Sequence, residues 1–391
     1  MEKLERIDRS FQTDAREKPA RPDDGTASGA LAAAEWVASL SPWPADGFGL
    51  ERIRALLAAL GEPQRRYRSI HVVGSNGKST VTRTAAAILR REGLHVGAYT
   101  SPHVSGWAER INVDGADADF ETAVARVREP AERIGATQFE ILTAAALAEF
   151  AEAGVEAAVV EAGLGGRLDA TNVLDAPVVV LTNVALEHTD VLGSTREEIA
   201  REKLAVVRPG ATVVLGEPEW EEAARAAGAS EVMVTGRANS ALALAAAEAL
   251  LGRELEPLAA VGLPGRVEYR GEAPLEIWDS ANNPGGVGYL LGRLPSRRFV
   301  LVVSILADKD ADAMLAALAA LGDTLFATTS SNARALPADE LARRAAPFFA
   351  RVEPVADPAE ALTRARAAAG PDGAVLVTGS HYVLADLSLT S

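Results

Sequence analysis

The chain contains no cysteine, and this absence excludes two classes of site at once. Without thiols the protein has neither disulfide bonds nor thiolate metal ligands. The sequence also lacks an apolar run of about 18 residues, which a membrane-spanning helix would need, and it opens without a signal-peptide pattern. We therefore expect a cytoplasmic protein that has no membrane partner.

Positive charge is scarce as well. Lysine and arginine total 39 residues against 54 aspartates and glutamates, which gives a net charge of -15 at pH 7. Nucleic acids are bound mainly through clustered lysine and arginine side chains, so this balance argues against a nucleic-acid partner. Small anions are not excluded, because the backbone of a single loop can bind them.

What the sequence does contain is an alternation of strand and helix patterns. The runs "SIHVV", "AAVVEAG" and "APVVVLTNV" predict buried strands, and "TVTRTAAAILRREG" and "TREEIAREKLAVVR" predict helices between strands. This order is typical of an α/β fold with a doubly wound, mostly parallel sheet. A second series of runs, "LEIWDSA", "RFVLVVSIL", "TLFATTS" and "GAVLVTGS", predicts a smaller Rossmann-like α/β domain toward the C-terminus.

The pattern also suggests domain limits. Residues 1–29 are charged and carry little apolar periodicity, so we expect a flexible tail there. We assign residues 30–240 to the first domain and 241–391 to the second, with the boundary between 236 and 262.

The clearest motif is "IHVVGSNGKST", residues 70–80, which stands between a predicted strand and a predicted helix. It is similar to the phosphate-binding loop G-x-x-x-x-G-K-[ST], and its strand–loop–helix context is the required one. The usual first glycine is missing, because Val72 occupies its place and Gly74 is the nearest glycine.

Such a loop can bind a nucleotide through a few groups. Backbone N–H groups of residues 75–79 at a helix N-terminus can surround phosphate oxygens, Lys78 can neutralise the γ-phosphate, and a following hydroxyl can bind Mg²⁺. The alternative is an ordinary strand-to-helix turn that Ser79 or Thr80 caps.

Three further residues suggest a site at the ends of strands. Glu161 ends the apolar run "AAVVE", just before a glycine-rich turn, where a carboxylate suits Mg²⁺. His188 follows the next apolar run, and Lys203 lies in the helix beyond it. Taken singly, each has an ordinary alternative: Glu161 as a cap or surface charge, His188 as a structural residue, and Lys203 as an exposed helix charge.

Taken together, these segments resemble the folylpolyglutamate synthase / dihydrofolate synthase family of the Mur ligase superfamily. "HVVGSNGKST" is similar to the family loop H-V-A-G-T-N-G-K-G-S, "YTSPHVSGWAERINVDG" to Y-T-S-P-H-L-x-x-x-x-E-R-I-x-x-x-G, and "VVEAGLGGRLDATNV" to a second family motif. "LEHTDVLGSTREEIAREKLAVVRPG" resembles a third, and "LPGRVE", "WDSANNPGG", "LADKD" and "GSHYVLADL" continue the resemblance in order to about Leu387.

The resemblance implies an ATP-dependent amide ligase that forms an acyl phosphate and adds L-glutamate to dihydropteroate or to a reduced folate. It implies two Mg²⁺ sites, a dependence on K⁺, a monomer, and a carbamylated Lys203. The implied catalytic residues are Lys78, Glu161, His188 and Lys203, and the implied metal ligands are Thr80, Ser101, Glu161, His188 and Lys203. The implied nucleotide-binding residues are Gly74, Ser75, Asn76, Gly77, Lys78, Ser79, Thr80, Asn239, Arg266, Asp279 and Asn282.

The chain departs from the family pattern in three places. Asn282 replaces a histidine of the family's D-G-A-H-N-P, so a hydrogen bond can persist but a cationic role cannot. The stretch between Gly210 and Asn239 is short, and Trp107 and Ala108 replace the residues expected before E-R-I. Two alternatives therefore stay open: a Mur-type ligase that acts on another carboxylate, and a nucleotide-binding family member that has lost catalysis.

Overall fold

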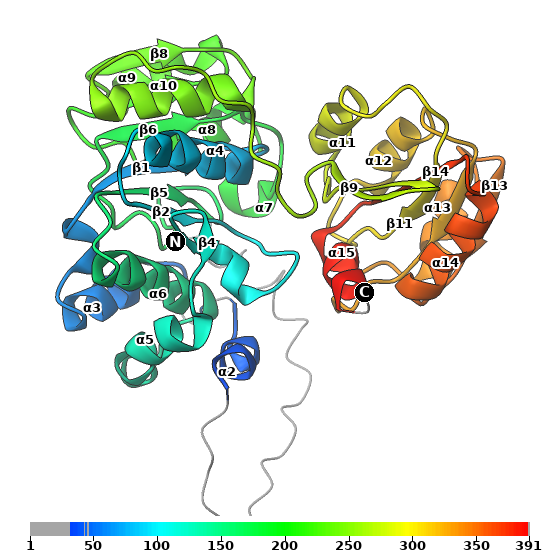
Figure 1. Cartoon of the computed structure of the whole chain (residues 1–391), viewed down its shortest axis with the longest axis horizontal. Coiled ribbons are helices and arrows are strands. Elements are labelled where there is room, and N and C mark those ends of the chain that lie inside the picture. The colour runs from blue at the N-terminus through cyan, green and yellow to red at the C-terminus, as the bar shows by residue number, and fades with distance from the viewer. Residues whose placement is uncertain (1–31, 43, 45–46, 390–391) are drawn as a thin grey trace, which may run out of the picture. The chain divides into compact units, whose positions relative to one another are not determined.

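The computed structural model describes residues 32–42, 44 and 47–389, so the tail expected over residues 1–29 lies outside the described residues (Figure 1). The described chain forms two compact units. The first unit comprises the residues up to Ser101 together with Arg110–Ala260, and the second comprises Pro102–Glu109 together with the chain from Val261 onward.

An eight-stranded sheet forms the centre of the first unit, in the order β4-β3-β2-β5-β1-β6-β7-β8. All neighbouring strands are parallel except at β3 and β4, which pair antiparallel. The strands are β1 (Arg68–Val73), β2 (Val96–Tyr99), β3 (Ile111–Val113), β4 (Ala116–Asp117), β5 (Ala157–Glu161), β6 (Val178–Leu181), β7 (Thr212–Leu215) and β8 (Glu231–Val234).

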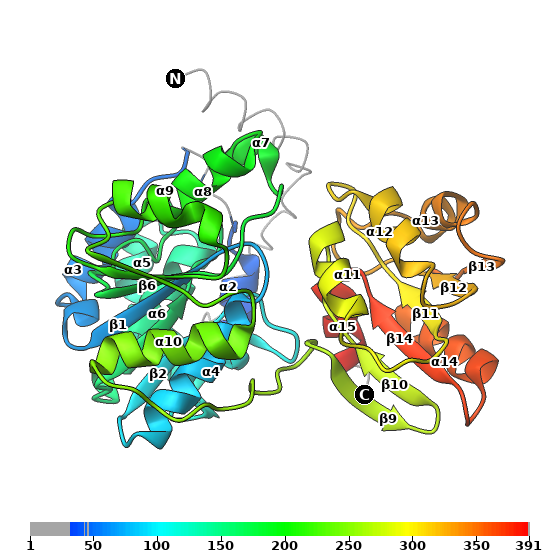
Figure 2. The same ribbon diagram turned by 90° about the horizontal axis from the view of Figure 1, so that it is seen from above.

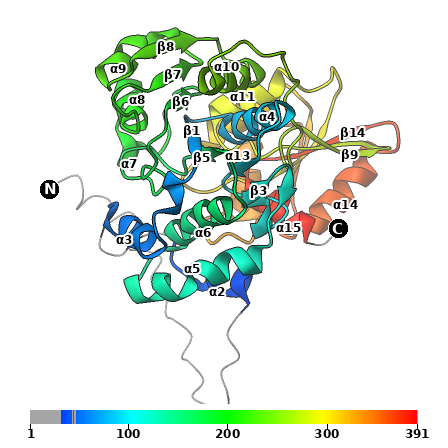
Figure 3. The same cartoon turned by 60° about the vertical axis from the view of Figure 1, so that its left-hand side comes forward.

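Helices cover both faces of this sheet, which explains why its central strands are apolar on both sides. On one face α4 and α10 lie side by side, as Figures 2 and 3 show, and bury a cluster with β1, β5 and β6. On the other face α8 and α9 pack against β6 and β7. The helices are α2 (Ala33–Ser39), α3 (Glu51–Ala59), α4 (Lys78–Arg91), α5 (Phe120–Ile134), α6 (Gln138–Glu152), α7 (Thr189–Leu192), α8 (Arg196–Leu204), α9 (Glu221–Ala226) and α10 (Asn239–Leu251), with 3₁₀ turns η2 (Pro63–Arg65) and η4 (Pro218–Trp220). A further 3₁₀ turn, η3 (Trp107–Arg110), begins in the segment that belongs to the second unit.

The second unit holds a six-stranded sheet in the order β13-β12-β11-β14-β10-β9, parallel except for the edge strand β9. Along β14 the side chains alternate: Ala374 and Leu376 pack toward α11, α12 and α13, whereas Val375 and Val377 pack toward α14 and α15. The elements are β9 (Glu268–Glu272), β10 (Leu275–Trp278), α11 (Pro284–Leu291), β11 (Val300–Val303), α12 (Ala311–Leu318), β12 (Thr324–Ala327), α13 (Ala338–Ala345), β13 (Arg351–Pro354), α14 (Pro358–Ala369), β14 (Ala374–Thr378) and α15 (His381–Ser388).

The predicted fold class is confirmed: both units are α/β with mostly parallel sheets. The division falls after Ala260, within the range 236–262 expected from sequence but later than the assigned limit of 240. The reason is helix α10, which packs along α4 and shares the apolar cluster of the first sheet. Across the described ranges, no helix combines the length and the apolar composition that a membrane span requires.

Candidate active site

The glycine loop connects β1 to α4, and two of its glycines are required by their surroundings. A Cβ on Gly74 would lie 1.9 Å from Oγ1 of Thr182, and the φ angle of Gly74 is 143°. Gly77 has a φ of 85° and precedes the first residue of α4. Side chains at either position would be strained, so the loop keeps its path only with glycine there.

The loop is anchored to the neighbouring strand β6. The Ser75 backbone N–H donates to the Asn183 carbonyl at 2.9 Å, and the Asn76 N–H donates to Asn183 Oδ1 at 3.1 Å. In return, Asn183 Nδ2 and Thr182 Oγ1 both donate to the Asn76 carbonyl, at 2.9 and 2.8 Å. These bonds fix the loop at the N-terminus of α4, where the first N–H groups have no acceptor within the helix and can bind an anion.

Lys78 is the first residue of α4, and its ammonium bends back over the loop. Its Nζ donates to the Ser75 carbonyl at 3.3 Å. The cation therefore stands at the helix N-terminus, where backbone dipoles and a lysine together favour phosphate.

Asn239 begins α10 and lies against the same loop. A Cβ on Gly77 would lie 2.5 Å from Asn239 Oδ1, so the carboxamide sits directly over that glycine. The side chain is buried, and its Nδ2 has no hydrogen-bond partner in the part of the chain that the structure describes. A buried donor of this kind, beside an anion-binding loop, fits a nucleotide oxygen or ring nitrogen.

Glu161 ends β5 beside Val72 of β1, so its carboxylate lies at the edge of the sheet where the glycine loop starts. Its side chain is buried; Oε1 accepts a hydrogen bond from Ser79 Oγ and Oε2 accepts one from the Ser101 backbone N–H, both at 3.1 Å. Sequence reasoning assigned the loop hydroxyl of the metal site to Thr80. In the structure the Ser79 hydroxyl bonds to the carboxylate, and Thr80 beside it is also buried; the role of Thr80 as a metal ligand stays a prediction.

Lys203 in α8 is buried, with 2% of its side chain exposed, although an isolated helix lysine is by default exposed. Its Nζ donates to Glu187 Oε1 at 2.9 Å and to the Gly74 carbonyl at 3.0 Å. Burial lowers the pKa of Lys203 and Lys78 adds to this effect, whereas Glu187 opposes it. Burial would raise the pKa of Glu187, but Lys203 and Lys78 outweigh it and lower that pKa to about 2.

His188 follows Glu187 directly and has left-handed backbone angles, with a φ of 45°. Its carbonyl accepts hydrogen bonds from the N–H groups of Val191 and Leu192, so the residue starts the short helix α7. This conformation is uncommon for residues other than glycine and often marks a functional position.

The glycine-rich loop after Glu161 is held by a buried polar chain. Asp169 accepts hydrogen bonds from the backbone N–H groups of Leu164 and Thr171 and from the Thr171 hydroxyl. Thr171 Oγ1 also lies 2.8 Å from His71 Nε2 of strand β1. Burial raises the pKa of Asp169 and, together with Arg208, lowers the pKa of His71 to about 3. These contacts tie the loop to the strand that carries the nucleotide loop.

The remaining nucleotide-binding candidates belong to the second unit. Asp279 follows β10 and is buried; its Oδ2 accepts from the Val267 N–H at 2.9 Å and its Oδ1 from the Ala281 N–H at 2.8 Å. Burial raises the pKa of Asp279 while the nearby Arg266 lowers it, with a net rise. Asn282 accepts a hydrogen bond from the Asn283 side chain at 3.3 Å.

The residues present fit one Mg²⁺ better than two. A buried carboxylate beside a serine hydroxyl offers the oxygen ligands that Mg²⁺ prefers, and Glu161 with Ser79 provides them. Within the described ranges no three histidine or carboxylate side chains gather closely enough to hold a metal ion. A second site would require the Lys203 cation to be converted into an oxygen ligand.

Sequence reasoning missed Glu187, whose carboxylate accepts a hydrogen bond from Lys203, the lysine that also donates to the Gly74 carbonyl of the loop. The signal was present, because Glu187 precedes His188 at the position where the family motif has an aspartate.

Comparison with protein families gives two matches that follow the two units. The model of the Mur ligase middle domain matches residues 72–256, and that of the Mur ligase glutamate ligase domain matches residues 265–381. Both matches agree with a division near Ala260.

Individual proteins are similar over most of the chain. The dihydrofolate synthase/folylpolyglutamate synthase of Mycobacterium tuberculosis is 34% identical and is aligned over 84% of this chain and 86% of its own length. An Escherichia coli structure in complex with DHPP and ADP superposes with a TM-score of 0.83 at 31% identity, covering 93% and 99% of the two chains. A bifunctional folylpolyglutamate synthase/dihydrofolate synthase solved with Mn, AMPPNP and L-glutamate gives 0.82 at 30%, covering 92% and 98%.

Proposed function

The chain belongs to the dihydrofolate synthase/folylpolyglutamate synthase family of the Mur ligase superfamily, and on that premise we propose that it is an ATP-dependent carboxylate–amine ligase. The proposed reaction joins L-glutamate to dihydropteroate, to a glutamylated reduced folate, or to both. The solved relatives that contain ADP, or AMPPNP with Mn and L-glutamate, support this choice of substrates and a divalent metal.

One observation carries the proposal. Three charged groups from different elements meet around a single loop: Lys78 bonds to the Ser75 carbonyl, Lys203 to the Gly74 carbonyl, and Glu161 to Ser79. Glu161 and Lys203 are buried and Lys78 is partly buried. Buried charges are costly, so a fold that places such groups together at the edge of a parallel sheet indicates a reaction there.

The reaction has two steps, and this chain's residues serve both. A carboxylate oxygen of the acceptor attacks the γ-phosphorus of ATP, the bond to the β–γ bridging oxygen breaks, and ADP leaves with that electron pair. The amine of L-glutamate then attacks the acyl carbon, phosphate leaves, and the amine releases a proton. Lys78 and the N–H groups of the loop would stabilise charge on the transferred phosphoryl group. A Mg²⁺ held by Glu161 and Ser79 would supply further charge stabilisation when bound.

The test is phosphate release by the purified protein with ATP, Mg²⁺ and L-glutamate, with dihydropteroate, with tetrahydrofolate, or with neither. We expect release to require a pteridine acceptor and to fall to background in Lys78→Ala. Activity with one acceptor or with both identifies the substrate. Release that is indifferent to every pteridine would indicate a different carboxylate acceptor, and no turnover with any acceptor would indicate a family member without catalysis.

We also propose that Lys203 is carbamylated. Its buried position lowers its pKa, so the neutral amine is easier to form than in an exposed lysine; the nitrogen of that amine bonds to the carbon of CO₂ with loss of one proton. The product is a carbamate, which carries the oxygen ligands that an ammonium lacks and which suits a second Mg²⁺.

Isotope-labelled bicarbonate tests this modification without an activity readout. We expect a protein-bound carbamate signal in the carbon NMR spectrum of the wild type and of Lys309→Ala, a lysine variant of the second unit. The signal should vanish in Lys203→Ala, whose ligase activity added bicarbonate should not restore. A signal that persists in Lys203→Ala would place the carbamate elsewhere.

Two finer properties complete the proposal. We expect activity to depend on K⁺, which omitting K⁺ from the assay checks, and we expect a monomer, which light scattering checks. The resemblance to the family is the support for both.

A further inference from the structure

A cavity lies at the opposite end of the first sheet from the nucleotide loop. Its residues precede the strands: Tyr67 comes just before β1, Asp175 stands before β6, and Arg208 before β7. In a parallel sheet all these positions lie at the amino edge, whereas Gly74 and Glu161 lie at the carboxyl edge. The cavity therefore does not belong to the candidate active site.

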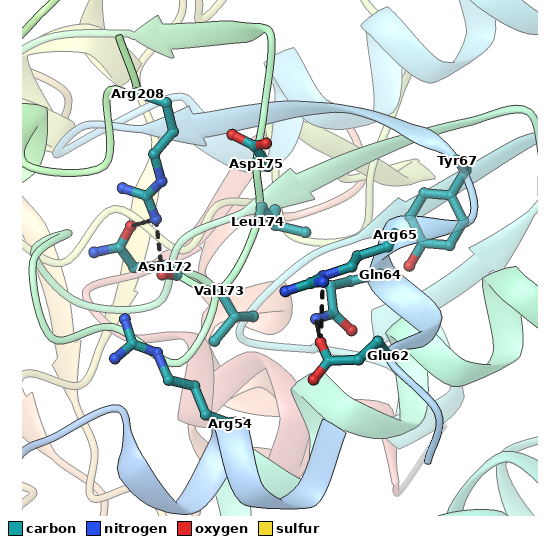
Figure 4. A pocket seen from close by; sticks show the side chains of 10 residues that line it. All are labelled: Arg54, Glu62, Gln64, Arg65, Tyr67, Asn172, Val173, Leu174, Asp175 and Arg208. Atoms are coloured by element: carbon teal, nitrogen blue, oxygen red, sulfur yellow. Dashed lines mark hydrogen bonds and ion pairs between the residues drawn. The ribbon is translucent and has the colours of Figure 1, made fainter. Parts of the chain in front are cut away.

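The cavity has a volume of about 790 Å³ and a predominantly charged and polar lining. Figure 4 shows the guanidinium groups of Arg54, from α3, and Arg208 directed toward one another, with Asn172 between them. The lining residues are Arg54, Glu62, Gln64, Arg65, Tyr67, Asn172, Val173, Leu174, Asp175 and Arg208.

Two of the three arginines have no carboxylate partner in the described part of the chain. Arg208 donates to the Asn172 carbonyl at 3.0 Å, to Asn172 Oδ1 at 2.8 Å and to the Val206 carbonyl at 3.3 Å, all of which are neutral. The guanidinium of Arg54 forms neither an ion pair nor a hydrogen bond with another described residue. Arginine is suited to bidentate binding of carboxylates, so this pair offers a place for an anionic group.

Gln64 gives an independent indication of a ligand. The residue is 92% buried, its Nε2 donates to Glu62 Oε2, and its Oε1 has no hydrogen-bond partner among the described residues. Gln64 lines the cavity, so a donor bound there, such as an N–H group, could pair with this buried acceptor. The exposed carboxylate of Asp175, which likewise forms no ion pair within the described ranges, can accept an ammonium group.

We propose that this cavity binds a short acidic peptide. Side-chain carboxylates of the peptide would meet Arg54 and Arg208, a peptide N–H would donate to Gln64 Oε1, and its N-terminal ammonium would meet Asp175. The volume suits a ligand larger than one amino acid. The same chemistry is found in α-linked acidic peptides and in γ-linked glutamyl chains, and the second source would connect the cavity to the product of the proposed reaction.

Isothermal titration calorimetry with triglutamate tests the proposal, using α-linked and γ-linked peptides in separate experiments and no ATP. We expect at least one linkage to bind, and Arg54→Gln to raise its Kd about tenfold or more, since a charge-assisted contact is lost. The matched control is Arg66→Gln, which removes another exposed charge, next to Arg65 but outside the cavity, and should change Kd less than about twofold.

Further titrations distinguish binding in this cavity from binding in the active site. Trialanine, which lacks the side-chain carboxylates, should not bind, and both Lys78→Ala and added ADP should leave triglutamate binding unchanged. Binding of neither linkage would overturn the proposal, as would equal weakening by Arg54→Gln and Arg66→Gln. Loss of binding in Lys78→Ala would place the peptide in the active site instead. Because the readout is binding alone, it is independent of whether the chain has the proposed ligase activity.

Discussion

Each of the two sheets buries one glutamate on a strand, and the two residues are held in different ways. Glu161 in β5 accepts hydrogen bonds from Ser79 of α4 and from the backbone of Ser101. Glu276 in β10 receives two bonds from the Arg366 guanidinium, at 2.6 and 3.0 Å, and one from Trp278 Nε1 at 2.8 Å.

The two glutamates differ in where their hydrogen-bond partners lie in the fold. Arg366 is half-exposed and Trp278 is a core residue, so the contacts of Glu276 connect α14 to its own sheet. The partners of Glu161 come from the first turn of α4, which follows the nucleotide loop, and from the segment after β2. Burial of a carboxylate is therefore a poor guide to function by itself, and the position of its partners decides between structure and chemistry.

The strongest test of this comparison is a matched pair of glutamate-to-glutamine variants. Glu161→Gln keeps the shape but removes the charge from the proposed metal site, so we expect kcat to fall about 10²- to 10³-fold with little loss of stability. Glu276→Gln weakens the pairing with Arg366, and we expect about 1–3 kcal/mol less unfolding free energy with kcat retained in the folded protein. Phosphate release and urea unfolding measure both. A similar loss of kcat in the two variants would break the comparison.

A pair of glycine variants, one in each unit, extends the comparison to the backbone. The expected effects on activity and stability are smaller. Gly74→Ala places a Cβ against Thr182 at a φ of 143°, so we expect about 1–3 kcal/mol of destabilisation and weaker ADP binding. Gly288→Ala in α11 meets no atom within 4 Å, and alanine there should stabilise the helix by about 0.5–1 kcal/mol. Calorimetric ADP titration and thermal unfolding measure the two effects. Unchanged ADP affinity in Gly74→Ala would mean that the backbone conformation of the loop does not contribute to nucleotide binding.

Much of the fold could be read from the sequence because its central strands are apolar on both faces. The runs that form β1, β5 and β6 stand out for this reason, and helices were expected between them. The short antiparallel strands β3 and β4 and helix α5 were not identified. Two- or three-residue strands bury too little to leave a pattern, and they depend on the neighbouring strand β2.

The candidate site was predictable where chemistry follows the ends of strands, as for Lys78 and Glu161. The site was not predictable where a tertiary contact determines which residue takes part in it. Ser79 and Thr80 are adjacent hydroxyls about 100° apart around α4, and only the folded position of Glu161 selects Ser79. Burial of Lys203 is another such case, because a lysine in an otherwise polar helix gives no sign of the carboxylate that it meets.

The last prediction concerns stability at acidic pH. It follows from the buried polar chain of Asp169, Thr171 and His71 in the first unit. Burial, with Arg208 nearby, lowers the pKa of His71 to about 3, while an unfolded chain titrates near its ordinary value of 6.5. Below pH 6.5 the His71 side chain is therefore protonated in the unfolded state, whereas in the folded state it stays neutral down to about pH 3. The free energy of unfolding falls as the pH is lowered across this range. Between pH 8 and pH 5 this single group should cost the wild type about 2 kcal/mol of unfolding free energy.

His71→Gln removes that titration but also the contact with Thr171, so we expect the variant to be less stable than the wild type at pH 8. The gap between the two should then narrow by about 2 kcal/mol at pH 5, because only the wild type loses the His71 contribution. Urea unfolding of both proteins at each pH measures the change. Parallel stability curves would mean that His71 is not held neutral, and the acid sensitivity of the first sheet would then have to come from its buried carboxylates.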